Sequence, residues 1–300
     1  MNDTVPYTNR YPEDVAAPSI LLLGPTATGK THSMRTIIDA GVELFIQFLE
    51  PGFREVVGDI SCEQGLHWNY IAPAAASWDM LLDSAKKINT MSYKTLADMT
   101  DINRQKYQQW FEVLGNMNNF HCQRCGKYFG DVELWGPDRA IAIDGLTGLS
   151  QIAMALVVGN KPAKSPSDWG VAQDNLENFV RKMTSSTRCW FLMASHIERE
   201  LEENSGVSQI MVSTLGRKLP PKIPFFFSDV ANTKRVLGTG GKPVWKWSTL
   251  TPNTDLKARN IPWSDDINPD FKPVVETFFR KNGLELPVIG KPVEVPIVPK

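Results

Sequence analysis

Eight residues near the start of the chain have the types and spacing needed to bind a triphosphate. The run Gly24-Pro25-Thr26-Ala27-Thr28-Gly29-Lys30-Thr31 has the form G-x-x-x-x-G-K-T. In such a loop the glycines let backbone N–H groups surround phosphate oxygens, and the N-terminus of the following helix adds partial positive charge. Lys30 would neutralise the β- and γ-phosphates, and the Thr31 hydroxyl would be a ligand of Mg²⁺. The motif therefore predicts that residues 24–31 bind ATP with Mg²⁺.

A carboxylate at the end of a later apolar run is suited to hold the metal. Residues 139–144 read as a short buried strand that ends in Asp144 and is followed by Gly145. We expect Asp144 to hold Mg²⁺ through a water molecule, as the aspartate of a Walker B strand does. An ordinary aspartate at a turn is the alternative, but the loop at 24–31 favours the metal role.

A base that activates water is also needed, and many ATPases place a glutamate directly after the Walker B aspartate. Here that position is Gly145, so the base must come from elsewhere. Glu50 follows the apolar run at 44–49, and the carboxyl ends of parallel strands face the crevice where α/β sheets bind ligands. We expect Glu50 to orient and deprotonate the attacking water. A solvated turn residue is the alternative.

Polar residues also end the apolar run at 189–194. Ser195 and His196 follow it directly. Side chains at this strand end can contact the γ-phosphate, so we expect Ser195 and His196 to sense whether it is present. The alternative is that they only hold the next loop in place.

A C-x-x-C motif forms a separate candidate site. Cys122 and Cys125, with Gly126 after them, look like one half of a zinc knuckle, whereas a structural Zn²⁺ needs four ligands. The candidates for the missing ligands are His121, His67, Cys62 and Asp131, and none of them has the spacing of a known zinc motif. The sequence leaves open whether the loop binds Zn²⁺ or is a degenerate zinc loop. Redox catalysis is disfavoured, because no thioredoxin-like βαβ frame surrounds the pair.

These residues need a scaffold whose strand ends converge, and the order of apolar runs predicts one. Strand-like and helical stretches alternate, which is the pattern of an α/β fold with a mostly parallel sheet and helices on both faces. We expect a helix from Thr31 to Ala40 that is closed by Gly41. The predicted strands are 19–23, 43–49, 67–71, 139–143, 189–194 and 225–231, with a hairpin near 234–238 and 243–249.

The predicted organisation is one core with additions. Residues 1–18 form an extended arm, 19–262 form the core, and 263–300 form a helix followed by a Pro-rich tail. Residues 77–138 are a helical insert that includes the C-x-x-C loop. We expect the spaced apolar side chains of its helices, at 77–118, to pack in the core. They are Trp78, Leu81, Leu82, Ala85, Ile88, Leu96, Trp110, Phe111 and Leu114.

Composition narrows the class of protein. The chain has 300 residues, 42% of them hydrophobic, which suits a single large α/β domain. A formal net charge of −1 predicts no overall attraction to nucleic acid or membrane, although it permits a local basic face. Four cysteines do not form a disulfide framework, and neither a leader nor a spanning segment is indicated. We therefore expect a cytoplasmic protein with no membrane partner.

The chain resembles the RecA-like ATPases in a combination of four features. These are the glycine loop, Glu50 at the end of the second strand, Asp144 without a following glutamate, and His196 at a polar strand end. Within that class the chain is similar to phage-encoded nucleotide-binding proteins that include RecA-type single-strand-annealing recombinases. The resemblance covers about residues 19–262. It implies a RecA-like P-loop NTPase fold, ATP hydrolysis, a ring or filament of identical chains, and action on single-stranded DNA in phage recombination or replication inside a bacterial host cell.

The resemblance also implies which loops contact DNA. In RecA-like proteins these follow the Walker B region and the sensor strand, and here they correspond to 159–168 and 198–222. Their cationic residues are Lys161, Lys164, Arg217, Lys218 and Lys222. From 205 to 263 the chain has nine Lys and Arg against two Asp, a charge that phosphates would attract. Trp245 and Trp247 alternate along a strand, so bases could stack on one face, the alternative being a solvated basic face over packed tryptophans.

Lys257 and Arg259 resemble the K-x-R element that reaches the γ-phosphate of a neighbouring subunit in the wider RecA-like group. An arginine supplied in trans stabilises transition-state charge, so the monomer would be a poor ATPase. Surface ion pairs are the alternative for these two residues.

Other functions share the same loop. Isopentenyl transferases that modify tRNA open in a similar way, but they are expected to carry an Asp-Ser pair where this chain has Glu50 and Pro51. A small-molecule kinase would need an arginine-rich lid, for which Arg217 and Lys218 offer little. A nucleotide-gated assembly protein of the phage particle is a third alternative.

Overall fold

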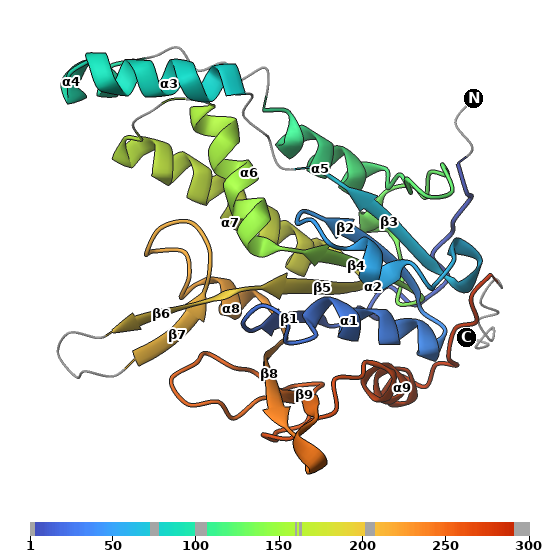
Figure 1. Cartoon of the computed structure of the whole chain (residues 1–300). Coiled ribbons are helices and arrows are strands. Elements are labelled where there is room, and N and C mark those ends of the chain that lie inside the picture. The colour runs from blue at the N-terminus through green and yellow to red at the C-terminus, as the bar shows by residue number, and fades with distance from the viewer. Residues whose placement is uncertain are drawn as a thin grey trace.

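A seven-stranded sheet with the order β3-β2-β4-β5-β1-β8-β9 forms the centre of the computed structural model (Figure 1). The structure describes residues 4–72, 78–99, 107–159, 161, 164–201 and 208–290. The strands from β3 to β8 in this order pair in parallel, and β9 pairs antiparallel with β8. The strands are β1 (Ser19–Leu23), β2 (Glu43–Phe48), β3 (Leu66–Tyr70), β4 (Arg139–Asp144), β5 (Trp190–Ser195), β8 (Asp229–Leu237) and β9 (Pro243–Ser248).

Helices cover both faces of this sheet. On one face lie α5 (Gln109–Asn118), α6 (Leu146–Val158) and α7 (Pro166–Ser186), drawn above the sheet in Figure 1. On the other face lie α1 (Lys30–Met34), the 3₁₀ helix η1 (Arg35–Ala40), α2 (Arg54–Val57) and α9 (Lys272–Lys281).

Two hydrophobic cores follow from the alternation of side chains along each strand. Ile141 and Ile143 of β4 belong to the core under α5, α6 and α7. Ala140 and Ala142 belong to the core under α1, η1 and α9. Because both faces are covered, the strands read as nearly continuous apolar runs, as in a buried parallel sheet.

The register of the central strands decides where the site lies. Leu23 at the end of β1 pairs with Ser195 at the end of β5, and Asp144 at the end of β4 pairs with Ala194 of β5 and Phe48 of β2. The carboxyl ends of four neighbouring strands, β2, β4, β5 and β1, therefore lie side by side. The predicted α/β fold, with a mostly parallel sheet and helices on both faces, is confirmed, and the closer resemblance to RecA-like P-loop NTPases stays a prediction.

The last strands differ from the prediction. Residues 223–226 form the short helix α8 (Ile223–Phe226), with Pro224 in its first turn, and one strand, β8, runs from Asp229 to Leu237. The hairpin expected near 234–238 and 243–249 is confirmed by the antiparallel pair β8 and β9, whereas the strand expected at 225–231 starts only at Asp229 and continues without a break into that hairpin. Proline is favoured in the first turn of a helix. The apolar residues after Pro224 resemble a strand, so the sequence pattern does not indicate this helix.

Two further elements depart from expectation. The helix expected at 31–40 is divided into α1 and the 3₁₀ helix η1, which Gly41 closes with φ 84°. The segment 198–222, expected to be a loop, contains the antiparallel pair β6 (Ile197–Leu201) and β7 (Ser208–Val212). Residues 202–207 between them, like residues 160, 162 and 163 of the other predicted DNA loop, lie outside the described residues.

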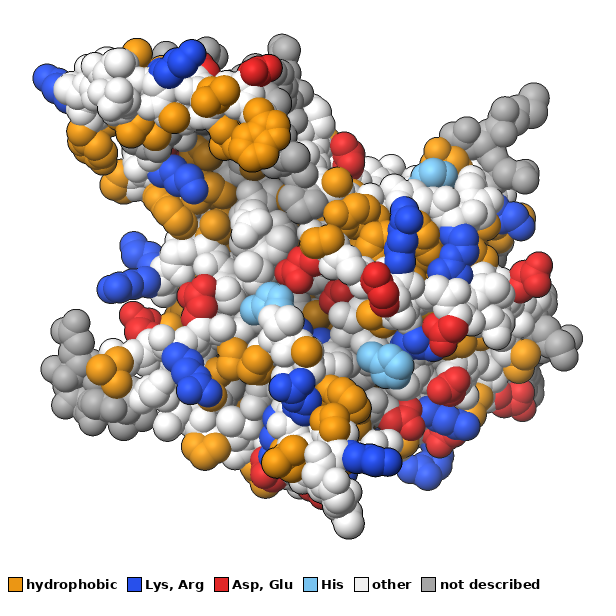
Figure 2. Space-filling model, in the orientation of Figure 1, with side chains coloured by type: hydrophobic (Ala, Val, Ile, Leu, Met, Phe, Trp, Pro, Cys, Tyr) orange, Lys and Arg blue, Asp and Glu red, His pale blue; other side chains and the backbone are white. Residues whose placement is uncertain are grey.

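The helical insert contains α3 (Trp78–Thr90), α4 (Tyr93–Ala97) and α5. Leu96 and Trp110 are buried, as expected, and Trp78 is 82% exposed. The expectation of core packing is also wrong for Leu81, Leu82, Ala85, Ile88, Phe111 and Leu114, all exposed. The apolar face of α3 does not reach the sheet, and Figure 2 shows hydrophobic side chains gathered over α3 and α4.

The terminal segments pack on the edges of the core. The Tyr7 hydroxyl donates to Asp138 Oδ1 at 2.7 Å, and the Val5 N–H donates to the carbonyl oxygen of Tyr128. At the other end, Phe278 of α9 packs edge-on against Trp190. Residues 291–300 of the predicted Pro-rich tail lie outside the described residues. Within the described ranges, no helix has the length and apolar character needed to cross a membrane.

Candidate nucleotide-binding site

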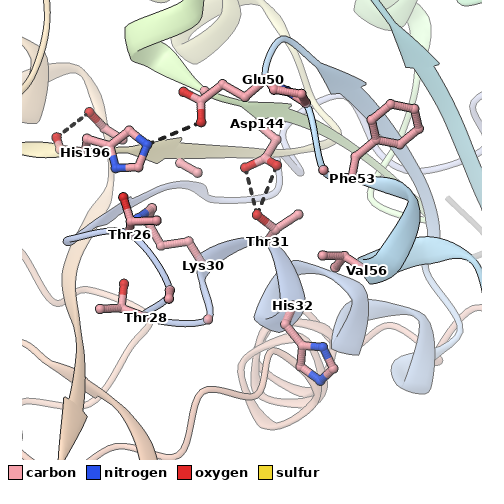
Figure 3. Close-up of a pocket in the computed structure, with 17 residues that line it drawn as sticks. Thr26, Thr28, Lys30, Thr31, His32, Glu50, Phe53, Val56, Asp144 and His196 are labelled. Atoms are coloured by element: carbon pink, nitrogen blue, oxygen red, sulfur yellow. Dashed lines mark hydrogen bonds and ion pairs between the residues drawn. The ribbon is translucent and has the colours of Figure 1, made fainter.

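A pocket lies at the edge where β1, β2, β4 and β5 end (Figure 3). Its walls come from the glycine loop, from the segment after β2, and from the ends of β4 and β5. Most residues predicted to form the site line it. The lining residues are Thr26, Ala27, Thr28, Gly29, Lys30, Thr31, His32, Glu50, Pro51, Gly52, Phe53, Val56, Asp144, Gly145, Ala194, Ser195 and His196.

The glycine loop is fastened to β8. A Cβ atom at Gly24 would lie 2.1 Å from Thr233 Oγ1 and 2.6 Å from the Thr233 carbonyl oxygen, so only glycine fits there. The hydroxyls of Thr28 and Thr233 are 2.7 Å apart, and Thr233 also donates to the Leu23 carbonyl. No sequence pattern marks Thr233, because it lies between the strands predicted at 225–231 and 234–238, a region in which β8 is continuous.

Lys30 is folded inside the loop. Its Nζ donates to the carbonyl oxygens of Gly24 and Pro25, both at 2.8 Å, and the residue is 8% exposed. Burial lowers the pKa of Lys30, while the charges of Asp144 and Glu50 act in the opposite direction. The ammonium is therefore placed among carbonyl dipoles at the position where phosphates of a bound nucleotide would accept its hydrogen bonds.

Thr31 and Asp144 meet as the Mg²⁺ prediction requires. The Thr31 hydroxyl lies 3.0 and 3.1 Å from the two carboxylate oxygens of Asp144, as the dashed lines in Figure 3 show. Burial raises the pKa of Asp144 to about 6, and the hydrogen bond from Thr31 opposes that shift. A hydroxyl and a carboxylate oxygen are hard ligands of the kind that Mg²⁺ prefers, so the pair fits that ion.

Glu50 follows β2 and His196 follows β5, and the two side chains meet over the end of β4, which lies between those strands. His196 Nε2 lies 3.2 Å from Glu50 Oε2, and both side chains are about one-third exposed, at 31% and 37%. No pattern in the sequence links these two residues, which only the fold brings into contact. Since the imidazole contacts one carboxylate oxygen, it orients the group that we expect to act as base.

Ser195 is buried beside them. Its carbonyl oxygen accepts from the Gly24 N–H at 3.1 Å, and its hydroxyl donates to the His196 carbonyl at 2.9 Å. Ser195 thus connects β5 to the glycine loop, and both sensor candidates line the pocket. Their sensing role stays a prediction.

Lys257 and Arg259 lie elsewhere and do not line the pocket. Lys257 pairs through its backbone with Val230 near the start of β8, whereas the pocket lies at the opposite ends of the strands. Lys257 Nζ donates to the carbonyl oxygens of Phe225 and Phe227, and the side chain of Arg259 is exposed. Neither residue reaches the nucleotide site of its own chain, so any contact would be made with another chain.

Three of the five cations predicted to bind DNA are paired with carboxylates. Lys161 Nζ lies 3.1 Å from Asp168 Oδ2, and Lys222 Nζ lies 3.0 Å from Glu177 Oε2. Arg217 Nε lies 3.6 Å from Glu200 Oε1. Among the residues that the structure describes, no carboxylate partner is found for the exposed Lys164 and Lys218.

The wider basic stretch is also partly neutralised. Lys234 pairs with Asp265 at 2.7 Å, and Lys246 pairs with Asp266 at 2.8 Å. Both aspartates lie just beyond residues 205–263, where nine cations were counted. The excess of positive charge within residues 205–263 is therefore partly balanced by Asp265 and Asp266, which lie outside that stretch but close to its lysines in space.

The two alternating tryptophans have different surroundings. Trp247 is 1% exposed and packs edge-on against Phe271, so the expectation that bases stack on it is wrong. Trp245 is 41% exposed, its Nε1 donates to the Ala27 carbonyl at 3.1 Å, and its ring lies against Gly29. The structure thus places Trp245 on the glycine loop, a position that spacing along the chain did not indicate.

Cys122 and Cys125 do not line the nucleotide pocket. They gather with Cys62 and His67, two of the four residues considered as further ligands, and the ligand atoms of all four lie within 4.8 Å of one another. The other two candidates, His121 and Asp131, are outside this group. Cys62 and His67 thus lie beside the C-x-x-C motif in space, although their spacing along the chain matches no known zinc motif.

No protein-family model matches the chain, and no curated protein matches it. Among solved structures it is similar to the flagellar accessory protein FlaH from Methanocaldococcus jannaschii, with 11% identity and a TM-score of 0.35 over 84% of this chain and 83% of that one. It is also similar to the RadB recombinase, with 9% identity and a TM-score of 0.33 over 81% of this chain and 92% of that one.

Proposed function

We propose that this chain binds ATP with Mg²⁺ and hydrolyses it. One observation carries the proposal: four neighbouring strand ends bring Lys30, the pair Thr31 and Asp144, and Glu50 around a single pocket. A phosphate-binding loop alone supports nucleotide binding. A carboxylate base positioned beside that loop supports hydrolysis as well.

Each residue has a distinct part in this reaction. The glycine loop and Lys30 hold the phosphates, and Thr31 and Asp144 would hold Mg²⁺, which neutralises charge on them. Glu50 takes a proton from the attacking water, and His196 holds the Glu50 carboxylate toward the pocket.

The direct test is phosphate release by the purified full-length chain with ATP and Mg²⁺. We expect turnover that falls to background when Lys30 is replaced by Ala, and that needs the divalent cation. Tight ATP binding without turnover would leave a nucleotide-gated assembly protein. Transfer of the phosphoryl group to an added acceptor instead of water would favour a kinase.

We further propose that the ATPase acts as a homo-oligomer on single-stranded DNA, in recombination or replication of a phage. The support is the exposed Arg259, which does not line the nucleotide pocket of its own chain, together with the exposed Lys164 and Lys218. Turnover should rise with protein concentration and with added single-stranded DNA, and the DNA effect should weaken with salt because phosphate contacts release counterions. Turnover that responds to neither DNA nor protein concentration would contradict this part.

A further inference from the structure

Four metal-binding side chains converge at the edge of the sheet that β3 forms. Cys62 begins the 3₁₀ helix η2 (Cys62–Gln64), His67 lies on β3, and Cys122 and Cys125 lie in the turn before Gly126. Their Sγ and ring nitrogen atoms all lie within 4.8 Å of one another. Three thiols and one imidazole from separate segments thus surround a single point.

The spacing of these atoms matches a tetrahedral zinc site. Tetrahedral Zn²⁺ with Zn–S bonds of about 2.3 Å and Zn–N bonds of about 2.0 Å separates two sulfurs by roughly 3.8 Å, and a sulfur from a nitrogen by roughly 3.5 Å. Here Cys62 Sγ lies 3.8 Å from Cys122 Sγ, and Cys125 Sγ lies 3.8 Å from His67 Nδ1. A disulfide would instead bring two sulfurs to about 2.05 Å. We propose that Cys62, His67, Cys122 and Cys125 bind one Zn²⁺ ion.

His67 is oriented as a metal ligand. Its Nδ1 faces Cys125, while its Nε2 lies 3.2 Å from Glu43 Oε1 on the other side of the ring. The second oxygen of Glu43 accepts from Arg139 Nε at 3.0 Å. A carboxylate behind the distal ring nitrogen is the usual support of a ligating histidine, because it fixes both the tautomer and the ring plane.

Aromatic packing fixes the same ring. The His67 imidazole stacks on Phe45, with centroids 4.9 Å apart and an interplanar angle of 19°, and Phe129 lies 4.3 Å away on a tilted plane. These contacts hold Nδ1 toward the three sulfurs before any ion binds. Glu43 is therefore a positioning residue, and Phe45 and Phe129 limit the rotation of the ligand.

The C-x-x-C turn is closed by its own backbone. The Gly126 N–H donates to the Cys122 carbonyl at 2.9 Å, the Cys122 N–H donates to the Lys127 carbonyl at 3.0 Å, and Gly126 has φ 73°, which favours glycine. With four protein ligands, no position is open for water or substrate. The site is therefore structural and not catalytic.

The metal would hold one wall of the nucleotide pocket. The segment between Glu50 and Cys62 carries Phe53 and Val56, both of which line that pocket. Arg124, within the C-x-x-C turn, donates to the carbonyl oxygens of Val57 and Ile60. Zinc thus fixes the Cys62 end of this segment, and the proposed base, Glu50, lies at its other end. This link to the pocket rests on the proposed function, whereas the metal site itself does not.

Metal content of the purified full-length protein tests the site. We expect one zinc per chain by elemental analysis, and none in Cys122→Ser. Replacing zinc by Co²⁺ should give the visible absorption of a tetrahedral thiolate site. Cys189→Ala, at a buried cysteine outside the cluster, and His121→Ala, at the neighbouring histidine, should keep the full zinc content. Folded wild-type protein without stoichiometric metal, or with Cys62 and Cys122 in a disulfide, would overturn the proposal.

Two variants separate ligation from simple misfolding. His67→Cys supplies a fourth thiolate and should retain zinc, whereas His67→Ala should lose it. Glu43→Gln should fold, keep the ligand set and bind zinc about 10- to 100-fold more weakly, the usual effect of removing such support. Equal affinity of Glu43→Gln and the wild type would contradict the positioning role of Glu43.

The link to the nucleotide pocket has its own measurement. Removing zinc with a chelator should raise KM for ATP or lower kcat, and restoring Zn²⁺ should reverse the change. Stoichiometric zinc whose removal leaves both constants unchanged would overturn the link and leave the metal site standing. A wild-type protein with zinc but no ATP turnover would instead contradict the proposed function.

Discussion

The Glu50 carboxylate occupies the space directly over Gly145. A Cβ atom at Gly145 would lie 2.9 Å from Glu50 Oε1 and 3.0 Å from Glu50 Cγ. The glycine that follows Asp144, in the place where many ATPases carry their catalytic glutamate, therefore makes room for a glutamate from the neighbouring strand end. Gly145 is thus a departure from the usual motif that leaves space for Glu50, the residue that we expect to act in place of the missing glutamate.

Replacing Gly145 by Ala should displace Glu50 and slow hydrolysis without removing the phosphate-binding loop. We expect kcat to fall at least about 10-fold, because a misplaced base loses much of its catalytic contribution. Gly145 also has φ 113°, so we expect alanine to destabilise the fold by about 1–3 kcal/mol. Steady-state kinetics with ATP binding by calorimetry check this. Gly115→Ala, in the helix α5, is the control, because outside that helix's own backbone no atom of the described residues lies within 4 Å of the new methyl group. Normal kcat in a folded Gly145→Ala protein would show that the contact is unimportant.

Glu50→Gln should bind ATP normally and lose hydrolysis by about 10²- to 10⁴-fold, the range expected for a general base. His196→Ala should cost less than Glu50→Gln, since His196 acts through its contact with Glu50. In the double variant the histidine change should add little, because residues that act as a unit are not additive. Single-turnover phosphate release measures all three, and full independence of the two changes would sink the proposed pairing.

Lys30→Ala should abolish the stabilisation of the protein by its ligand. At a concentration of Mg-ATP about 100-fold above Kd, binding adds about 2.7 kcal/mol to the free energy of unfolding, and this gain should vanish in the variant. Thermal unfolding with and without Mg-ATP is the measurement. Lys94→Ala removes a charge from an exposed lysine and should leave the shift intact. A full shift in Lys30→Ala would place the phosphates elsewhere.

Trp245 should report nucleotide binding by its fluorescence. Its indole N–H donates to the Ala27 carbonyl, and its ring lies against Gly29, so closure of the loop around phosphate must alter its surroundings. We expect Mg-ATP to change the emission of the wild type. Trp245→Phe should lose most of that change and bind about 2- to 10-fold more weakly, since one hydrogen bond is worth about 0.5–1.5 kcal/mol. An unchanged signal in Trp245→Phe would assign the reporter to another tryptophan.

Arg259 should act in another subunit. Arg259→Ala alone should turn ATP over slowly, and mixing it with Lys30→Ala should partly restore turnover, because some interfaces then pair an intact Lys30 site with an intact Arg259. Turnover across mixing ratios is the readout. If no ratio exceeds the activity of the separate variants, Arg259 does not act across an interface.

Local sequence patterns were enough to predict the central strands and the residues that gather at their ends. The glycine loop, the apolar runs and the carboxylates that end them are each encoded within a few adjacent residues, so the strands near the site and the gathering of Lys30, Glu50, Asp144 and His196 followed from parallel strand order. A parallel sheet aligns the carboxyl ends of neighbouring strands whatever separates them along the chain.

The tertiary structure decided what depends on contacts between distant segments. Cys62 and Cys122 are 60 positions apart, and no spacing rule joins them until β3 and the C-x-x-C turn fold side by side. Thr233 and Trp245 reach the glycine loop, and Asp265 and Asp266 neutralise lysines, only through the packing of β8, β9 and the segment after them. Charge and metal ligation act through space over a few ångströms, so linear order alone does not determine them.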